Sequence, residues 1–228
     1  VPAMNGIERA NPDTLSGVFS SFDDANWTDK TKLSDERLKD LIEHMSKIKV
    51  GNNNYSADVM GDSYEFLIKK FADLSKKNAG EFYTPRAVTD FMAKMIQPKI
   101  GEKMADFACG TGGFLTSWLN ELNRKITDTD DRDEYDSSVY GIEKKQFPYM
   151  LCITNMLLHD IDVPRVYHDN SLTKDVLDYT EADQFDVILM NPPYGGSEKN
   201  DVKNHFPTDL ASSETADLFM SVIMYRLK

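Results

Sequence analysis

Asn191, Pro192, Pro193 and Tyr194 form the stretch of this chain that is best suited to chemistry. They follow residues 187–190, a short apolar run that is typical of a buried strand in a parallel sheet. The two prolines end any strand, because they lack an N–H donor and fix φ. In open α/β sheets, ligands bind just outside the carboxyl ends of the strands. The sequence therefore predicts that these four residues lie at the mouth of a binding site.

The Asn191 side-chain oxygen and the Pro192 carbonyl are both hydrogen-bond acceptors. Two acceptors that converge on one NH2 group would draw its protons into a tetrahedral arrangement and free the nitrogen lone pair for attack on an electrophile. The Tyr194 ring can stack on a planar group, as aromatic side chains do on bases that have left a duplex. These residues suit a planar substrate that carries an NH2 group. A plain strand-ending turn is the alternative, since Asn-Pro is common in turns.

A second candidate site is the glycine turn 110–113, which follows a strand predicted over residues 104–109. A helix is predicted after the turn, with the apolar stripe Phe114, Leu115, Trp118, Leu119 and Leu122. Strand, glycine turn and helix make up the cofactor half of a doubly wound fold, and glycines let a ligand approach the backbone. The spacing is G-x-G-G, not the G-x-G-x-x-G of dinucleotide enzymes, and the sequence has no G-x-x-x-x-G-K-[ST] motif.

Two acidic residues are predicted at the ends of the next two strands. Glu143 ends the strand predicted over 139–143, where an acid typically accepts hydrogen bonds from ribose hydroxyls. A surface acid is the alternative interpretation. Asp169 follows the strand predicted over 165–168 and could accept a hydrogen bond from an adenine amino group, or it could cap the loop.

Residues 78–86 precede a predicted helix with the apolar stripe Val88, Phe91, Met92, Met95 and Ile96. Thr84 is a good N-cap for this helix and Pro85 a good first helical residue. Phe82 and Tyr83, two adjacent aromatics before a capped helix N-terminus, could form a ligand wall, and the free N–H groups could receive a carboxylate. An ordinary helix start explains the same residues equally well.

The first 78 residues are predicted to form a helical extension with an irregular lead-in over 1–33, pinned by Phe19, Phe22 and Trp27. Two amphipathic helices follow, the first of them capped by Ser34. Their stripes are interpreted as core packing; they are Leu38, Leu41, Ile42, Met45 and Ile48, then Tyr64, Leu67, Ile68, Phe71 and Leu74. The acidic run 127–138 is predicted to be a solvated surface loop, not a metal site, and residues 195–200 a flexible loop.

Composition limits the class of protein. The chain has 228 residues, of which 40% are hydrophobic and 28% charged, enough for one globular α/β domain and an extension. The net charge is −12, whereas a self-sufficient nucleic-acid binder is usually basic. Any grip on DNA would come from another subunit or region. Cys109 and Cys152 lack metal-ligand spacing, and no apolar run reaches membrane-spanning length, so a reducing, cytoplasmic location is expected. The chain starts without Met and ends inside a helical pattern, which suggests a fragment.

Three motifs together resemble one family, the modification (methyltransferase) subunits of type I restriction–modification systems. They are G-E-F-Y-T-P at residues 80–85, D-F-A-C-G-T-G-G-F at 106–114 and N-P-P-Y at 191–194. They occur in the order cofactor lid, cofactor loop, catalytic loop. The resemblance implies a Rossmann-like S-adenosylmethionine-dependent methyltransferase sheet over residues 79–228, without its C-terminal strands, behind a small helical region.

The resemblance also implies roles for single residues. The lid residues Glu81, Phe82, Tyr83, Thr84, Pro85 and Arg86 would border the methionine end of S-adenosylmethionine. The loop residues Asp106, Thr111, Gly112 and Gly113 would approach the cofactor, partly through backbone atoms. Glu143 would hold its ribose and Asp169 would face its adenine. Asn191, Pro192, Pro193 and Tyr194 would hold a target adenine flipped out of double-stranded DNA.

The implied activity is methylation of adenine N6 in DNA. The implied partners are a DNA-specificity subunit and a second modification subunit, with a nuclease subunit as a further candidate. A protein-glutamine methyltransferase shares N-P-P-Y and is one rival, although the lid motif argues against it. A non-catalytic, cofactor-binding assembly module is another, although the intact N-P-P-Y group argues against that role.

Overall fold

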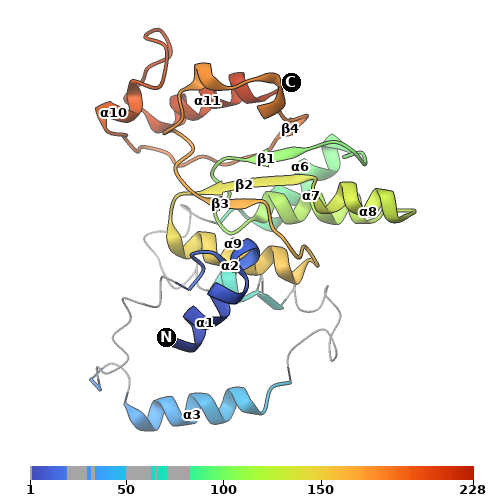
Figure 1. Cartoon of the computed structure of the whole chain (residues 1–228), viewed down its shortest axis with the longest axis vertical. Helices are drawn as coiled ribbons and strands as arrows, with labels where there is room; N and C mark the ends of the chain where they lie inside the picture. The colour runs from blue at the N-terminus through green and yellow to red at the C-terminus, as the bar shows by residue number, and fades with distance from the viewer. Residues whose placement is uncertain (1, 20–29, 32–33, 50–62, 65, 71–82) are drawn as a thin grey trace.

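The computed structural model describes the whole chain except residues 1, 20–29, 32–33, 50–62, 65 and 71–82 (Figure 1). Within the described ranges, the centre of the fold is a parallel sheet of four strands in the order β3-β2-β1-β4. The strands are β1 (Met104–Asp106), β2 (Val139–Glu143), β3 (Val166–His168) and β4 (Val187–Ile188). All four were predicted, each within a few residues of its observed bounds.

The strand order places a topological switch between β1 and β4. The chain runs outward from β1 through β2 to β3, and it then returns to pair β4 with the other side of β1. Met104 is therefore in register with Val139 on one side and with Val187 on the other. The carboxyl ends of strands that flank such a switch form a crevice in which α/β proteins bind ligands.

Helices cover both faces of the sheet (Figure 1). On one face lie α6 (Arg86–Ile96), α7 (Gly113–Asn123), α8 (Thr129–Asp136) and α9 (Gln146–Leu158), and on the other lie α10 (Asn200–Lys203) and α11 (Thr215–Arg226). Two short 3-10 helices, Val176–Asp178 and Glu181–Asp183, lead into β4. Each face of the sheet has its own hydrophobic core. The first core lies between the sheet and the helices α7 and α9, and the second lies between the sheet and the helices α10 and α11. Because side chains alternate along a strand, Met104 packs into the first core and Ala105 into the second. This double cover explains why the strands are apolar.

The α7 stripe is buried, whereas Met92 is the one residue of the α6 stripe that packs against the core. Trp118 and its neighbours on α7 are fully buried. On α6 the buried residues are Thr89 and Ala93, while Phe91 is 62% and Met95 67% exposed. Small side chains let α6 approach α7 closely, and Ser117 Oγ donates to Asp90 Oδ1 at 2.7 Å. Periodicity alone favoured the larger, exposed face.

The predicted cap of α6 is also corrected by one residue. Pro85 occupies the N-cap position and no side chain caps the helix. The Pro85 carbonyl accepts from Val88 N–H at 2.9 Å, so the chain enters the helix through backbone contacts. The Thr84 hydroxyl is left for a different contact, described below.

Within the acidic run 127–138, residues Thr129–Asp136 form a helix, α8, so the predicted loop was wrong there. The Asp128 carboxylate caps the helix by accepting from Asp131 N–H at 2.9 Å. Acidic residues in a first turn favour a helix through its dipole, and Arg132 pairs with Asp136 one turn later at 3.0 Å. Tyr135 is buried and anchors the helix on the domain. The acids were therefore a helix-start signal.

The lead-in is also more regular than predicted. It contains α1 (Pro2–Ala10) and α2 (Pro12–Leu15), and Pro12 stands at the first helical position, where proline is favoured. The segment after α2 docks on α9, since Tyr149 OH donates to the Ser16 carbonyl at 3.1 Å and Val18 lies in the first core. Phe19 is partly buried against the same core, as predicted. Phe22 and Trp27 lie outside the described residues.

The helix α3 (Asp35–Ser46) begins where the sequence predicted, with the Ser34 side chain accepting from Arg37 N–H at 3.3 Å. Its apolar stripe is not core, because no α3 residue is buried and Leu41 and Met45 are 52% and 54% exposed. Nothing in the described part of the chain covers that stripe.

Little of the second predicted helix is described. Residues 63, 64 and 66–70 are helical, Ile68 is buried and Leu67 is exposed. Tyr64 OH donates to the Leu151 carbonyl of α9 at 2.9 Å, which ties this helix to the sheet domain. Phe71 and Leu74 lie outside the described residues.

The predicted loop over residues 195–200 leads directly into a helix. The helix α10 starts at Asn200, and Val202 and Phe206 are buried in the second core. After α11, the chain returns to the sheet beside β4, where Phe185 and Leu227 form a parallel bridge. None of the described helices combines the length and the apolar character that a membrane span requires.

Arg226, near the end of α11, is 5% exposed and lies among four aromatic rings. Its guanidinium carbon is 4.4 Å from the Tyr179 ring centre, 4.8 Å from Phe107, 5.1 Å from Phe185 and 5.7 Å from Tyr140. Its Nε donates to the Asp183 carbonyl at 2.7 Å. A desolvated cation over aromatic faces stabilises a fold by about 2 kcal/mol or more.

Replacing Arg226 with alanine should lower the free energy of unfolding by about 3 kcal/mol, because it removes these contacts and leaves a cavity. Urea denaturation measures the change. Met224→Ala, on the exposed side of the same helix, is the matched control and should change it by less than about 0.5 kcal/mol. Equal effects of the two substitutions would contradict a stabilising role for the contacts between Arg226 and the four aromatic rings.

Candidate active site

The carboxyl ends of the strands surround a cavity of about 470 Å³. Every strand contributes to its wall: residues 107–108 follow β1, residues 143–145 end β2, residues 169–171 follow β3, and Asn191 and Pro193 follow β4. The loop 196–198 and two α11 residues, Thr215 and Phe219, complete it. Sites for small ligands and cofactors typically have volumes of about 300–1,000 Å³.

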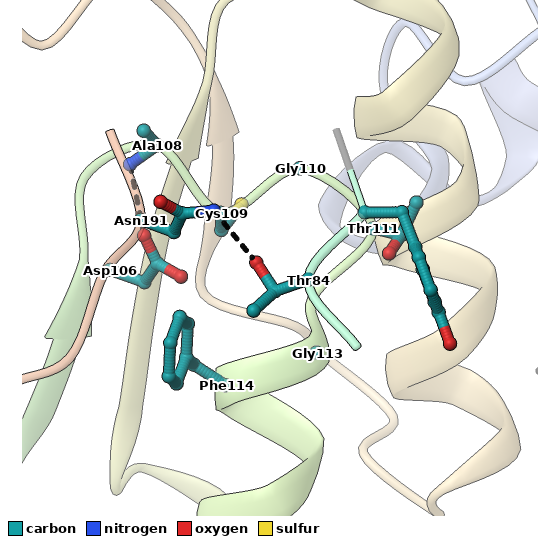
Figure 2. Close-up of a pocket in the computed structure, with 10 residues that line it drawn as sticks. Thr84, Asp106, Ala108, Cys109, Gly110, Thr111, Gly113, Phe114 and Asn191 are labelled. Atoms are coloured by element: carbon teal, nitrogen blue, oxygen red, sulfur yellow. Dashed lines mark hydrogen bonds between the residues drawn. The ribbon is translucent and has the colours of Figure 1, made fainter. Parts of the chain in front are cut away.

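A smaller hollow of about 20 Å³ adjoins the glycine turn (Figure 2). Its lining combines Tyr83 and Thr84 from the segment before α6, Asp106 at the end of β1, residues 108–111 and 113–114 of the turn, and Asn191. Asn191 lines both spaces. Of the N-P-P-Y motif, Asn191 therefore lies beside the glycine turn.

The glycine turn is held from below by α9. Gly112 has φ +82°, and a Cβ there would lie 2.7 Å from Cys152 Sγ, so only glycine fits. Asn155 Nδ2 donates to the Thr111 carbonyl at 3.0 Å. Asn155 is 1% exposed and was missed in the sequence, although an asparagine on the apolar face of a helix is an available signal.

The two cysteines lie beneath this turn. Cys109 and Cys152 are free thiols with sulfur atoms 3.8 Å apart. The contact with Cys152 and the burial of the site raise the pKa of the Cys109 thiol well above its usual value. Cys109 is therefore a neutral packing residue of the turn.

Glu143 connects β2 to the glycine turn. Its Oε2 accepts from Gly110 N–H at 2.9 Å and its Oε1 accepts from Lys145 N–H at 2.7 Å. The carboxylate is 8% exposed and lines the larger cavity. An ionised carboxylate has about four acceptor positions, so two remain for a ligand. Glu143 can therefore fix the turn and still bind a pair of hydroxyl groups.

Asp106 is the other acid beneath the turn. It is 1% exposed, and its Oδ1 accepts from Ala108 N–H at 3.0 Å. Burial raises its pKa from 3.8 to about 8, against the opposing effect of the Ala108 hydrogen bond, and the charge of Glu143 raises it further. In the ligand-free protein this carboxyl group is therefore neutral below about pH 8.

This shift predicts how stability depends on pH. Because the native state keeps the Asp106 proton up to about pH 8 and the unfolded state releases it near pH 3.8, the associated stability is present at low pH and is lost as pH rises to 8. At pH 8.5, Asp106→Asn should raise the free energy of unfolding of the ligand-free protein by at least about 1 kcal/mol, and by less at pH 5. Denaturation at the two pH values measures this, and equal changes would contradict it.

Arg86 holds the start of α6 against the glycine turn. Its NH1 donates to the Gly113 carbonyl at 2.9 Å and to Ser117 Oγ at 3.1 Å. It also bonds Thr116 Oγ1. The guanidinium thus faces α7 and does not line either of the two spaces described above.

The other predicted residues divide into two groups. Tyr83, Thr84, Asp106, Thr111, Gly113, Glu143, Asp169, Asn191 and Pro193 line the two spaces. Tyr194 is 82% exposed, and neither it nor Pro192 lines the larger cavity. Gly112 is on the side of the turn that packs against Cys152, and Pro85 is exposed at the start of α6. Glu81 and Phe82 lie outside the described residues.

An ion pair that the sequence did not reveal closes one wall of the cavity. Lys144 Nζ, just after β2, lies 2.6 Å from Glu198 Oε1 in the loop after N-P-P-Y. Glu198 has only 12% of its side chain exposed. In the described part of the chain, no group of three or more His, Cys, Asp or Glu side chains is arranged to hold a metal ion.

The sheet order, the glycine turn and the cavity at the strand ends define a Rossmann-like methyltransferase fold. A modification subunit assigned to a type I restriction enzyme from Vibrio vulnificus YJ016 superposes with a TM-score of 0.74 at 38% identity, over 84% of this chain and 40% of that one. A chain from a study of complex assembly in the type I R-M system gives 0.75 at 34% identity, over 85% and 39%.

The sequence matches a family directly. The model of the family N-6 DNA Methylase matches residues 55–228, and the chain belongs to this family. The type I restriction enzyme EcoEI methylase subunit of Escherichia coli is 43% identical over 189 residues, which is 82% of this chain and 38% of that protein. The chain thus spans about two fifths of the length of these relatives.

Proposed function

We propose that this chain carries the catalytic centre of a modification subunit of a type I restriction–modification system, which transfers a methyl group from S-adenosylmethionine to N6 of adenine in DNA. The observation that carries the proposal is the position of Asn191. Asn191 lines both the hollow at the glycine turn and the larger cavity, and Glu143 and Asp169 also line the larger cavity. Family membership and the EcoEI relative support the same reaction.

The residues present fit S-adenosylmethionine. The larger cavity has a suitable volume, and Glu143 keeps two acceptor positions toward it for the ribose hydroxyls. Asp169 uses Oδ1 to accept from Asn170 N–H at 2.7 Å, which leaves Oδ2 for the adenine amino group. Tyr83, Thr84 and the glycine turn would enclose the methionine end. When bound, the cofactor supplies a methyl group on a positively charged sulfur.

The chain's own residues then position and polarise the target. Asn191 Oδ1 and the Pro192 carbonyl would accept hydrogen bonds from the adenine amino group and direct its lone pair toward the methyl group. The base must leave the duplex to reach them, and the exposed Tyr194 ring is available to stack on it. A strong general base is not needed, because the product ammonium loses its proton readily.

The proposed partners rest on the net charge of the chain and on its similarity to known proteins. A chain with net charge −12 does not gain DNA affinity from its overall electrostatics, so we propose that a DNA-specificity subunit supplies recognition, with a second modification subunit and a nuclease subunit as further partners. One structural relative comes from a study of such assembly. A cytoplasmic location suits this substrate and the two free thiols.

We also propose the domain division predicted from the sequence, with catalytic residues 79–228 and a helical extension before them. The Tyr64–Leu151 hydrogen bond and the docking of Val18 show that parts of the extension pack on α9. The extension would therefore support the cofactor side of the site, and is not a free tail.

The test is methylation mapping. The full-length chain, co-expressed with its specificity subunit, should protect DNA at a defined site, and mass spectrometry of the digested DNA should show N6-methyladenine. Labelled methyl transfer to a release-factor-like protein in place of DNA would establish the glutamine alternative. Cofactor binding without transfer to either substrate would establish the assembly-module alternative.

A further inference from the structure

We propose that Thr84 is a positioning residue that orients the Asn191 carboxamide for the target amino group. The inference deepens the proposed function and rests on it. Asn191 Nδ2 donates to Thr84 Oγ1 at 3.3 Å, across 107 positions of sequence. Figure 2 shows the amide nitrogen turned toward Thr84 and the amide oxygen on the opposite side.

The orientation of this amide decides whether Asn191 can act. An amide oxygen accepts hydrogen bonds, whereas an amide nitrogen only donates them. An amino group on the substrate is also a donor, so a carboxamide turned by half a rotation would oppose donor to donor. With Nδ2 engaged by Thr84, Oδ1 is the atom left for the substrate. A hydroxyl can accept as well as donate, so when a substrate donor occupies Oδ1, Thr84 supplies the acceptor that Nδ2 needs in this productive orientation.

Asn191 has few other restraints. Its side chain is exposed, and the hydrogen bond to Thr84 is the side-chain hydrogen bond that the described residues provide for it. The backbone around it is fixed by the prolines that follow, but proline does not restrict χ1 or χ2 of the preceding residue to one value. Without Thr84, the amide would exchange between orientations in solvent.

Thr84, in contrast, is held in position by its contacts with the glycine turn and the start of α6. It is half-buried, and its carbonyl oxygen would lie 3.9 Å from a Cβ on Gly113, so the segment rests against the glycine turn. Two residues later the α6 helix begins, and its first residue, Arg86, donates to the Gly113 carbonyl at 2.9 Å. The hydroxyl is thus held relative to the turn that would receive the cofactor, and it transmits that position to Asn191.

The test uses two substitutions at Thr84 in the full-length chain assembled with its specificity subunit. Thr84→Val keeps the shape and removes the hydroxyl, while Thr84→Ser keeps the hydroxyl and removes the methyl group. The single-turnover rate of methyl transfer at saturating cofactor and DNA should fall roughly 10-fold or more in the valine variant and by less than about three-fold in the serine variant. Because Thr84 also lines the hollow that would enclose the methionine end, rates are compared at saturating cofactor, and calorimetry should give the two variants cofactor dissociation constants within about two-fold of each other.

A second comparison isolates the orienting role. In an Asn191→Asp background both side-chain oxygens are acceptors, so there is no wrong orientation to suppress. Thr84→Val should then reduce the remaining rate by less than about two-fold, much less than in the Asn191 protein. An equal reduction in both backgrounds would overturn the orienting role, because Thr84 would then act on something other than the amide.

Other outcomes separate this inference from the proposed function. Equal rates for wild type and Thr84→Val would overturn the inference and leave adenine methylation intact. A loss in both variants with weakened cofactor binding would overturn it in favour of a cofactor contact. Absence of adenine methylation by the wild-type assembly would overturn the proposed function itself, and this inference with it.

Discussion

Replacing Asn191 with alanine is expected to abolish methyl transfer to adenine and to leave cofactor binding nearly unchanged. Asn191 lines the junction between the two spaces, and its oxygen is the side-chain acceptor available there for an amino group. Removing one preorganised polar group from a reaction centre typically lowers the rate about 100- to 1,000-fold. The side chain is exposed and supports no core packing, so the fold should be unaffected.

Single-turnover methylation and calorimetric titration with S-adenosylmethionine separate the two effects. The matched control is Asn123→Ala, an exposed asparagine at the end of α7 and away from the cavity, which should change neither. Asn191→Asp keeps an acceptor oxygen and should retain more activity than the alanine variant. Loss of cofactor affinity in parallel with activity would make Asn191 a structural residue of the turn.

The sheet and the location of the site were accessible from the sequence because both depend on local signals. Short apolar runs that end in glycine, proline or an acid predicted all four strands, and parallel strands carry their ligands at one end. Glu143 ends a strand, and Asp169 and Asn191 each follow one, so their convergence on one cavity needed only the strand order.

The faces of the helices were less accessible. On α6 four of the five residues of the apolar stripe are exposed and the small Thr89 and Ala93 are buried, because α7 approaches closely there. On α3 an apolar stripe is present without cover in the described part of the chain. Periodicity reports that a helix has an apolar face, but it does not report what covers that face.

Contacts between distant segments could not be predicted at all. Nothing local marks the Arg226 guanidinium as the centre of four aromatic rings from other elements. The Thr84 hydroxyl was interpreted as a helix cap because the chemistry of capping is local, whereas its partner Asn191 is 107 residues away. Such pairs depend on the topology that the strand order creates.

Replacing Glu143 with alanine should weaken cofactor binding first and the methyl-transfer step second. The substitution would remove two hydrogen bonds from the ribose hydroxyls to the carboxylate. It would also leave the Gly110 N–H, which donates to Glu143 Oε2, without this partner. Hydrogen bonds to charged groups contribute about 1.5–3 kcal/mol each, so the loss of two should raise the cofactor dissociation constant by roughly 100-fold or more. At saturating cofactor, the single-turnover rate should stay within about five-fold of wild type, since Glu143 does not contact the target amino group.

Two comparisons separate the ribose contact from the support of the turn. Glu134→Ala, an exposed acid of α8, controls for the change in charge and should have no effect. Binding of S-adenosylhomocysteine and of its 2′,3′-dideoxy analogue should then be measured in the wild type and in Glu143→Ala. If the carboxylate holds the hydroxyls, the wild type will prefer the natural ligand and the variant will bind both alike. A preference that survives in the variant would assign Glu143 to the glycine turn alone, through its bonds to Gly110 and Lys145.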